Sequence, residues 1–404
     1  MPELVPFRGL RYADGGVLDA VTAPPYDVID PDHRERLADA DPHNAVRLIL
    51  PEGADPYRDA GALLDAWVAD GTLTVDGTPT FTVYRMTYPD GDGTRSTIGV
   101  LGALVLPERI EDGQVLPHER TLPKAKTDRL DLLRATRANL DPIWGLCPTA
   151  GLSATLASVT GAPPRATAVD ELGVLHEAWT LTDPEGMEAV RAAVAAGPLV
   201  LADGHHRFET ALAYRAERDA TDPGADAILC FVVELADDQL VVHAIHRLVH
   251  GLPADVEARL APTCELEDAG ANTPDAVTAL RARLRRDGGI GLVLPDRLLR
   301  LVPRADALAA ARAELPTALH DVASAHFDAL VRPALGAATL AYRNDASACA
   351  AMVAAGTADA AIILQPVSVP TIRDAGRAGV RMPEKTTFFW PKPRTGIVFR
   401  RLDD

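Results

Sequence analysis

Residues 198–220 read PLVLADGHHRFETALAYRAERDA, and this stretch decides what fold we expect. An apolar run beginning at Leu199 predicts a short buried strand that ends at residue 202. From Phe208 onward, apolar residues recur at helical spacing. Asp203 and Gly204 separate the two patterns, so the stretch predicts a buried strand, a tight turn and a helix.

The turn favours an anion site. Backbone N–H groups at the start of a helix attract anions, and the helix dipole adds to this attraction. Arg207 can bind a phosphate through two parallel hydrogen bonds. In the alternative interpretation, Asp203 merely caps the helix while His205 and His206 are solvated. A metal site is less favoured, because adjacent histidines on one helical turn diverge.

The chain is long enough for two or three modules, since 404 residues exceed what one hydrophobic core usually serves. Helical and strand patterns alternate without a regular β-α-β order, so we expect an α+β or irregular α/β fold with mixed sheets and flanking helices. We expect an N-terminal region over 1–160, a core with the turn over 161–250 and a C-terminal region over 251–404. One compact unit is the alternative.

Local patterns predict several elements. Residues 31–40 and 57–70 have helical patterns, with Asp30 as the expected cap of the first and Gly71 closing the second. The sequence PDGDG at 89–93 lies between two strand-like runs and predicts a hairpin.

Charge and cysteine content narrow the possible partners. There are 40 basic and 57 acidic residues, a net charge of −17, which disfavours binding to nucleic acid or anionic lipid. No run of eighteen apolar residues occurs, so we expect no membrane span. The four scattered cysteines are typical of reduced thiols. We therefore expect a cytoplasmic protein with a small-molecule substrate; the sequence does not predict its oligomeric state.

Lysine is rare in this chain and occurs in two short clusters, PHERTLPKAKTDRL (117–130) and RMPEKTTFFWPKPRTG (381–396). A compact ammonium group is a good point-charge partner for a phosphate oxygen. We therefore predict that Lys124, Lys126, Lys385 and Thr386 bind phosphate. The alternatives are chance clustering, a solvated basic helix at the first cluster and an aromatic strand packed in a core at the second.

The DGHHR turn resembles the phosphate-binding turn of the ParB and sulfiredoxin superfamily, which includes ParB nucleotidases, sulfiredoxins and free-serine kinases. The resemblance implies a catalytic or metal-positioning role for Asp203 and His206. It also implies that three residues line the phosphates: Gly204, His205 and Arg207. A sulfiredoxin-like reductase would need a reactive cysteine in the turn, and residues 203–207 contain none.

The PPYDVID segment at 24–30 holds two acids in a turn made rigid by two prolines. Serine kinases of the superfamily use an acidic residue as base toward the substrate hydroxyl, and this resemblance makes Asp27 the candidate base. A plain turn with an aspartate cap is the alternative.

Five segments together resemble the prokaryotic domain-of-unknown-function family 1015: PFRGLRY, PPYDVI, PHERT, ADGHHR and MPEKTTFFWPK. Some relatives are serine kinases that use inorganic pyrophosphate. The resemblance implies a small-molecule phosphotransferase, a free L-serine kinase with pyrophosphate, ATP or ADP as donor and Mg²⁺ as cofactor. The alternative is a ParB-like nucleotide-binding regulator without catalysis on small molecules.

Overall fold

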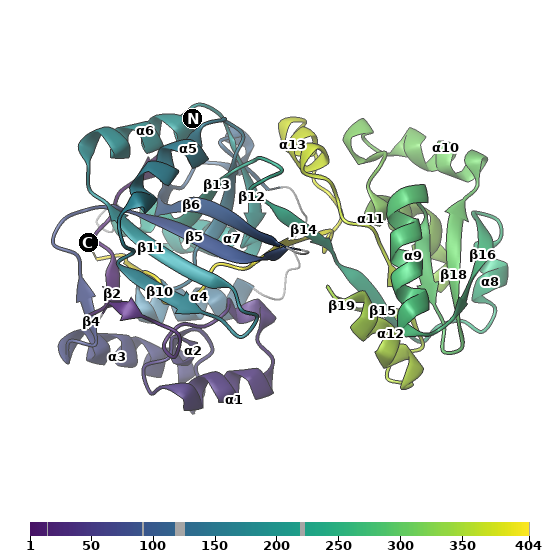
Figure 1. Cartoon of the computed structure of the whole chain (residues 1–404), viewed down its shortest axis with the longest axis horizontal. Helices are drawn as coiled ribbons and strands as arrows, with labels where there is room; N and C mark the ends of the chain where they lie inside the picture. Colours follow the sequence, from purple (N-terminus) through teal and green to yellow (C-terminus); the bar gives the residue numbers. More distant parts are fainter. Residues whose placement is uncertain (14, 91–92, 118–125, 219–222, 404) are drawn as a thin grey trace. The chain divides into compact units, whose positions relative to one another are not determined.

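The computed structural model describes residues 1–13, 15–90, 93–117, 126–218 and 223–403, and it divides into two compact units (Figure 1). Unit 1 comprises Met1–Pro117, Thr121–Leu240 and Pro391–Asp404. Among the described residues, unit 2 comprises Val241–Trp390. The chain therefore leaves unit 1 after Leu240 and returns to it for its last residues.

This division differs from the three regions expected from the sequence. A boundary near residue 160 falls inside unit 1, because the next two strands, Ala166–Val169 and Leu175–Leu181, each pair with a strand from earlier in the chain. The C-terminal region is also not one piece, since Pro391–Asp404 belongs to unit 1. Pairing between distant strands leaves no mark on local composition, so the sequence pattern missed both features.

Unit 1 is built on a ten-stranded mixed sheet with the order β3-β10-β11-β5-β6-β13-β9-β12-β7, and β1 pairs with β6. The strands are β1 (Leu4–Val5), β3 (Gly16–Val17), β5 (Phe81–Asp90), β6 (Gly93–Val105), β7 (Val115–Pro117), β9 (Ile143–Cys147), β10 (Ala166–Val169), β11 (Leu175–Leu181), β12 (Leu199–Asp203) and β13 (Ala227–Glu234). The predicted hairpin is confirmed as β5 and β6. Two small pairs accompany the sheet: β2 (Leu10–Tyr12) with β4 (Leu73–Val75), and β8 (Ala138–Asn139) with β22 (Arg400–Arg401).

In Figure 1, α5 and α6 lie near the top of unit 1, where α5 packs against β6 and β13, and α1, α2 and α3 lie at the bottom, where α3 packs against α4 and β4. The helices of unit 1 are α1 (Pro31–Ala40), α2 (Val46–Ile49), α3 (Pro56–Ala69), α4 (Lys126–Thr136), α5 (Leu152–Ala157), α6 (Pro184–Ala195) and α7 (His205–Glu217). The main core joins apolar residues of the central strands to those of α5, α6 and α7. Burial of this apolar surface is what holds the sheet and these helices together.

The predicted helix ends of unit 1 are confirmed. Asp30 caps α1, since its carboxylate accepts the backbone N–H of His33 at 2.7 Å. Gly71 follows α3 with a φ of +83°, in the left-handed region that glycine adopts without strain.

Unit 2 has a six-stranded antiparallel sheet with the order β16-β18-β17-β20-β15-β19, while β14 pairs with β21. Its strands are β14 (Val241–Ala244), β15 (His246–His250), β16 (Cys264–Ala271), β17 (Ile290–Val293), β18 (Arg297–Pro303), β19 (Thr339–Arg343), β20 (Ala360–Ile363) and β21 (Thr387–Trp390). Its helices are α8 (Val256–Leu260), α9 (Pro274–Asp287), α10 (Ala305–Glu314), α11 (Ala323–His326), α12 (Ala346–Ala354) and α13 (Val369–Arg377). One core lies under α9 and α12, and a second lies under α8 and α10.

The predicted α+β fold class, with mixed sheets and flanking helices, is confirmed. The ParB/sulfiredoxin-like core stays a prediction. All four cysteines are buried and free of disulfides. Among the helices of the described residues, none combines the length and apolar character needed to cross a membrane.

Candidate functional site

The Asp203 turn has the strand-turn-helix geometry that its sequence predicts. Strand β12 ends at Asp203, and α7 begins at His205. Between them Gly204 has a φ of +84°, a left-handed conformation that favours glycine. A Cβ at this position would lie 2.8 Å from Cγ2 of Ile143 in β9, so packing excludes a side chain as well. Both the backbone conformation and the packing therefore require glycine at position 204.

A register shift in β12 aims Asp203 at the turn. The pairing of β12 with β9 is regular to Leu201 and then shifts by the time it reaches Asp203. Such irregularities re-aim side chains at the ends of strands. Strand β9 runs antiparallel to β12, so Asp141 and Pro142, which precede β9, lie beside the turn.

Both carboxylate oxygens of Asp203 are paired with cations. The ammonium of Lys392 donates to Oδ1 at 2.6 Å, and Nη2 of Arg207 donates to Oδ2 at 2.8 Å. The three side chains are 18%, 9% and 10% exposed, in the order Asp203, Lys392, Arg207. Gly204 is the N-cap residue of α7, and no side chain caps this helix. The alternative in which Asp203 only caps the helix is therefore wrong.

The two cations fix the charge of Asp203. Burial alone would raise the pKa of its carboxyl group, but Lys392 and Arg207 outweigh burial and hold the pKa well below the ordinary value. Asp203 is therefore an anion throughout the physiological pH range. In this arrangement it is a poor proton acceptor, and its chemical effect is to hold two cations in place.

Arg207 is held on a second side by the chain before β9. Its Nη1 donates to the carbonyl oxygen of Pro142 at 2.5 Å. Burial lowers the pKa of Arg207, but nearby carboxylates outweigh burial and raise it above the ordinary value. Three aspartates contribute these charges: Asp203, Asp141 and Asp27. The guanidinium is therefore charged and rigidly oriented.

Asp141 is a buried acid that the sequence analysis missed. Its side chain accepts a hydrogen bond from the hydroxyl group of Thr395, and the residue is 8% exposed. Burial raises the pKa of Asp141 to about 6, although the charges of Arg207 and Arg129 oppose this rise. A carboxyl group with this pKa changes its protonation state near neutral pH, as a general base must.

The PPYDVID turn belongs to the same neighbourhood through the C-terminal segment of unit 1. Ala23 and Thr395 form an antiparallel bridge, with N···O distances of 3.1 and 2.8 Å. The guanidinium of Arg129 lies 4.2 Å from the ring centre of Tyr26. Asp27 follows in the short 3-10 turn Tyr26–Val28 and is exposed. The structure thus brings Asp27, Asp141 and the Asp203 turn into one charge cluster.

The two histidines of the turn occupy the first residues of α7. His205 and His206 are both partly exposed. The charge of His205 also contributes to lowering the pKa of Asp203, after burial and the effects of Lys392 and Arg207.

The first lysine cluster is only partly described. Lys124 lies outside the described residues, and Lys126 is the first residue of α4. Of the arginines that follow, Arg129 is 7% exposed and joins the charge cluster. Arg134 instead pairs with Glu217 at 2.6 Å.

The second lysine cluster is divided between the two units. Lys392 belongs to unit 1, whereas Lys385 and Thr386 belong to unit 2. The Thr386 hydroxyl is 2.7 Å from the hydroxyl of Ser324 and donates to the carbonyl oxygen of Pro383 at 2.7 Å, and the residue is 3% exposed. Lys385 is partly buried and has a φ of +54°.

Neither Lys392 nor Asp141 was predicted as a site residue. Lys392 was visible as one of four lysines, but 189 residues separate it from Asp203, and nothing in the sequence pairs them. Asp141 lies in the segment NLDPI, which has no motif to mark it. The side chains of the described residues contain no group of three or more potential metal ligands.

Comparisons with solved structures find distant similarities. A free serine kinase solved with AMP is 14% identical, with a TM-score of 0.37, and the match covers 68% of this chain and 83% of that one. A conserved hypothetical protein from Pyrococcus furiosus is 12% identical, with a TM-score of 0.39 and coverage of 72% and 93%. A C-terminally truncated SbnI from Staphylococcus aureus is 13% identical, with a TM-score of 0.36 and coverage of 74% and 86%.

No curated protein matches the chain. A family match does exist, and it spans most of the sequence. The family is described as protein of unknown function (DUF1015), and its model matches residues 4–325. This range includes the PPYDVID turn, Asp141 and the Asp203 turn, and the resemblance noted in the sequence is confirmed. The chain belongs to the DUF1015 family.

Proposed function

We propose that this protein is a small-molecule phosphotransferase whose active site is the Asp203 turn, with free L-serine as acceptor and pyrophosphate, ATP or ADP as donor. The observation that supports the proposal most is that Lys392 and Arg207 both donate hydrogen bonds to the carboxylate of Asp203, at a helix start that has no side-chain cap. Unlike a lone helix terminus, this arrangement also supplies two fixed cations.

The charge balance of the turn suits a phosphorylated ligand. Two cations share a single carboxylate, so Asp203, Arg207 and Lys392 taken by themselves carry one net positive charge. The surrounding cluster adds one further cation, Arg129, and two further acids, Asp27 and Asp141. Phosphoryl transfer depends mainly on positioning the reactants and stabilising the charge on the transferred group. The start of α7, with Gly204 and His205, would hold the phosphates beside these cations.

The residues of the turn remain accessible enough for this role. Asp203, Gly204, His205, His206 and Arg207 are all partly exposed, whereas the flanking Ala202 and Phe208 are buried. The turn is therefore less buried than the strand and the helix that flank it, and we propose that a phosphate group approaches the protein there.

Asp203, Asp27 and His206 are the catalytic residues that we propose, with different tasks. Asp203 would position the two cations, because its own oxygens are already paired. Asp27 is the exposed carboxylate that we propose as base toward the serine hydroxyl. His206 would lie close to the transferred group. Asp141 is a second candidate base, since its pKa of about 6 allows it to accept a proton near neutral pH.

Mg²⁺ is part of the proposal as an ion that arrives with the donor. In phosphoryl-transfer sites Mg²⁺ usually contacts one or two carboxylates together with substrate phosphates and water. Asp27 is the exposed acid of the cluster that could contact it. Lys124, Lys126, Lys385 and Thr386 remain proposed phosphate ligands.

An assay for phosphoserine tests the proposal directly. The full chain is incubated with L-serine, Mg²⁺ and each of ATP, ADP and pyrophosphate, and phosphoserine is quantified by mass spectrometry. AMP and ADP, which occupy solved free serine kinases, serve as ligands in parallel binding measurements. We expect product with at least one donor.

Matched variants then locate the site. R207Q should reduce the rate by roughly 10²–10³-fold, as loss of a charge-stabilising donor does. R191Q, an arginine on α6 whose side chain is 46% exposed, should leave the rate unchanged. Full activity of R207Q would exclude the Asp203 turn as the active site. Nucleotide binding without product from any hydroxyl acceptor would favour a nucleotide-binding regulator instead.

A further inference from the structure

Three polar side chains in the interior of unit 1 form a hydrogen-bonded network, which we call the Tyr84 network: Tyr84, His176 and Asp170. The Tyr84 hydroxyl on β5 is 2.6 Å from Nδ1 of His176 on β11, and Nε2 of His176 is 3.3 Å from Oδ2 of Asp170. Tyr84 and His176 are fully buried, and the side chain of Asp170 is 10% exposed. A buried polar network of this kind rigidifies the parts of the fold that it joins.

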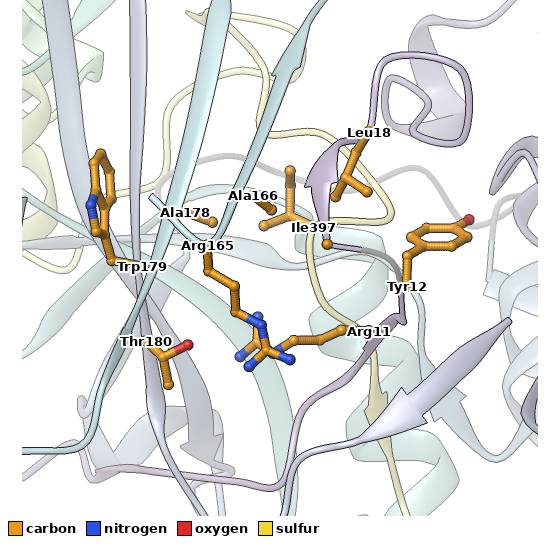
Figure 2. A pocket seen from close by; sticks show the side chains of 10 residues that line it. Arg11, Tyr12, Leu18, Arg165, Ala166, Ala178, Trp179, Thr180 and Ile397 are labelled. Atoms are coloured by element: carbon orange, nitrogen blue, oxygen red, sulfur yellow. The ribbon is translucent and has the colours of Figure 1, made fainter. Parts of the chain in front are cut away.

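The last segment of unit 1 lies on the face of the sheet that carries the Tyr84 network. Tyr84 pairs with Ala178 of β11, and paired residues of antiparallel strands point to the same face. Figure 2 shows Ile397 of the last segment near Ala178. The backbone N–H of Arg394 donates to the Tyr84 hydroxyl at 3.1 Å. The network is therefore joined to the backbone of the C-terminal segment.

The hydrogen bonds of the network have one direction. Because a backbone N–H can only donate, Tyr84 accepts from Arg394 and directs its own proton to Nδ1 of His176. Nε2 of His176 then carries the ring proton and donates it to Asp170. Burial lowers the pKa of His176, which keeps the ring neutral in this role. Loss of the Tyr84 hydroxyl would therefore remove the partner of two buried groups, the N–H of Arg394 and Nδ1 of His176.

The guanidinium of Arg394 holds the same segment from other sides. Its Nε donates to the hydroxyl of Thr22 at 2.9 Å, and its Nη2 donates to the carbonyl oxygen of Thr22 at 2.7 Å. Its Nη1 donates to Glu171, the neighbour of Asp170 in the sequence, at 3.2 Å. The Arg394 side chain is 3% exposed. Buried hydrogen bonds to its backbone and to its side chain thus fix Arg394 in one position.

Two donors to the acids of the proposed site lie next to Arg394. Lys392, two residues earlier, donates to Asp203 at 2.6 Å. Thr395, the next residue, donates to Asp141. A shift of the backbone at Arg394 would therefore move both donors.

We propose that Tyr84 and His176 are positioning residues, which hold Lys392 on Asp203 through the backbone of Arg394. The expected effect on the reaction rate rests on the proposed function, whereas the coupling between Tyr84 and Lys392 does not. A displacement of about 1 Å near reacting groups can lower a rate roughly 10²-fold. The Tyr84 hydroxyl thus affects the reaction through the place of the Lys392 ammonium.

A double-mutant cycle, measured by urea unfolding of the full chain, tests the coupling without reference to activity. K392M is introduced into the wild type, Y84F and Y88F. Tyr88 is a buried tyrosine of the same strand whose hydroxyl lies 3.2 Å from that of Thr97, so Y88F is the matched control. We expect K392M to raise the unfolding equilibrium constant of the wild type and of Y88F by the same factor, and that of Y84F by a factor roughly threefold to tenfold smaller. Equal factors in Y84F and the wild type would overturn the proposal, because independent sites are additive.

Phosphoserine production provides the second readout. Y84F should lower kcat by roughly 10-fold to 10²-fold and leave the KM for L-serine unchanged, while Y88F keeps the wild-type rate. A wild-type rate in Y84F would also overturn the proposal. Absence of product from the wild type would refute the phosphotransferase, and the unfolding cycle alone would then decide whether Tyr84 positions Lys392. If Y84F does not fold, T22V, which removes a hydroxyl that binds Arg394, replaces it in the cycle with the same two outcomes.

Discussion

The Asp30 turn and the Asp203 turn of unit 1 both present an aspartate just before a helix, yet the two acids have different partners. Asp30 is exposed and accepts a backbone N–H three residues later, at 2.7 Å. Asp203 is largely buried and binds two cations, one of them 189 residues away. The first acid thus stabilises its own helix, and the second organises distant segments of the chain.

One residue of spacing accounts for much of this difference. Asp30 is itself the N-cap of α1, with Pro31 at the first helical position. Asp203 lies one residue earlier relative to α7, because Gly204 occupies the N-cap position. A side chain at the N-cap reaches the N–H groups of the first turn, whereas one that precedes a glycine cap is released for other contacts. Glycine at the cap therefore leaves both the acid and the helix start available to other groups.

The largest effect should come from removing the charge of Asp203. D203N leaves Lys392 and Arg207 buried without their counter-charge, which should cost roughly 3–5 kcal/mol in the free energy of unfolding. Because the folded-state pKa of Asp203 is depressed, this stabilisation is present above the ordinary value of 3.8 and is lost as the pH falls below it. Urea unfolding at neutral pH and in acid measures both effects.

Asp27, an exposed acid of the PPYDVID turn, provides the control variant for D203N. D27N should change the free energy of unfolding by less than about 0.5 kcal/mol, since it removes no buried partner. Equal destabilisation by D27N and D203N would contradict the distinction between the two turns.

The next largest effect should come from the glycine that separates Asp203 from α7. G204A places a side chain at a φ of +84° and 2.8 Å from Ile143. G71A places one at a φ of +83° where no heavy atom beyond its chain neighbours lies within 4 Å. The left-handed backbone should cost both variants roughly 1–2 kcal/mol in the free energy of unfolding. Crowding against Ile143 should cost G204A a further 1–3 kcal/mol or so.

Urea unfolding of both glycine variants separates backbone strain from packing. If G204A and G71A lose the same stability, then the contact with Ile143 does not restrict position 204, and the turn is less tightly constrained than its geometry indicates.

Sequence patterns predicted the local geometry of the Asp203 turn well. The strand, the turn at Gly204 and the helix follow from apolar periodicity and glycine chemistry, which act over a few residues. The partners of Asp203 could not be predicted in this way. Lys392 and Asp141 approach the turn only because β9 pairs with β12 and the C-terminal segment returns to unit 1. Such contacts depend on the tertiary fold and leave no periodic signal.

The lysine cluster at 381–396 shows that residues close in sequence can have different surroundings in the fold. Its spacing predicted one anion-binding segment, but the unit boundary after Trp390 divides it. Lys392 is paired with Asp203, while the Thr386 hydroxyl is buried beside Ser324. Sequence proximity therefore did not translate into a common environment.

Asp141 provides an acid whose charge is suppressed, in contrast to Asp203. Its folded-state pKa of about 6 lies above the ordinary value of 3.8, so its contribution to stability is fully present below pH 3.8 and is lost as the pH rises through about 6. D141N can keep the hydrogen bond from Thr395 but cannot ionise. The free energy of unfolding of D141N should therefore rise by roughly 2–3 kcal/mol relative to that of the wild type between pH 4 and 7. Urea unfolding across this pH range gives the difference, and a constant offset would show that Asp141 does not titrate there.

The smallest effect should come from the helix cap at Asp30. D30A removes one hydrogen bond to the start of an exposed helix and should cost about 1 kcal/mol in urea unfolding. D30S should recover most of that loss, because a serine hydroxyl can accept the same N–H of His33. D32A, which removes an exposed acid from the first turn of α1 without removing the cap, should cost only a few tenths of a kcal/mol or so. If D30A were as destabilising as D203N, Asp30 would have partners beyond its own helix, and the two turns would no longer differ in the way their contacts indicate.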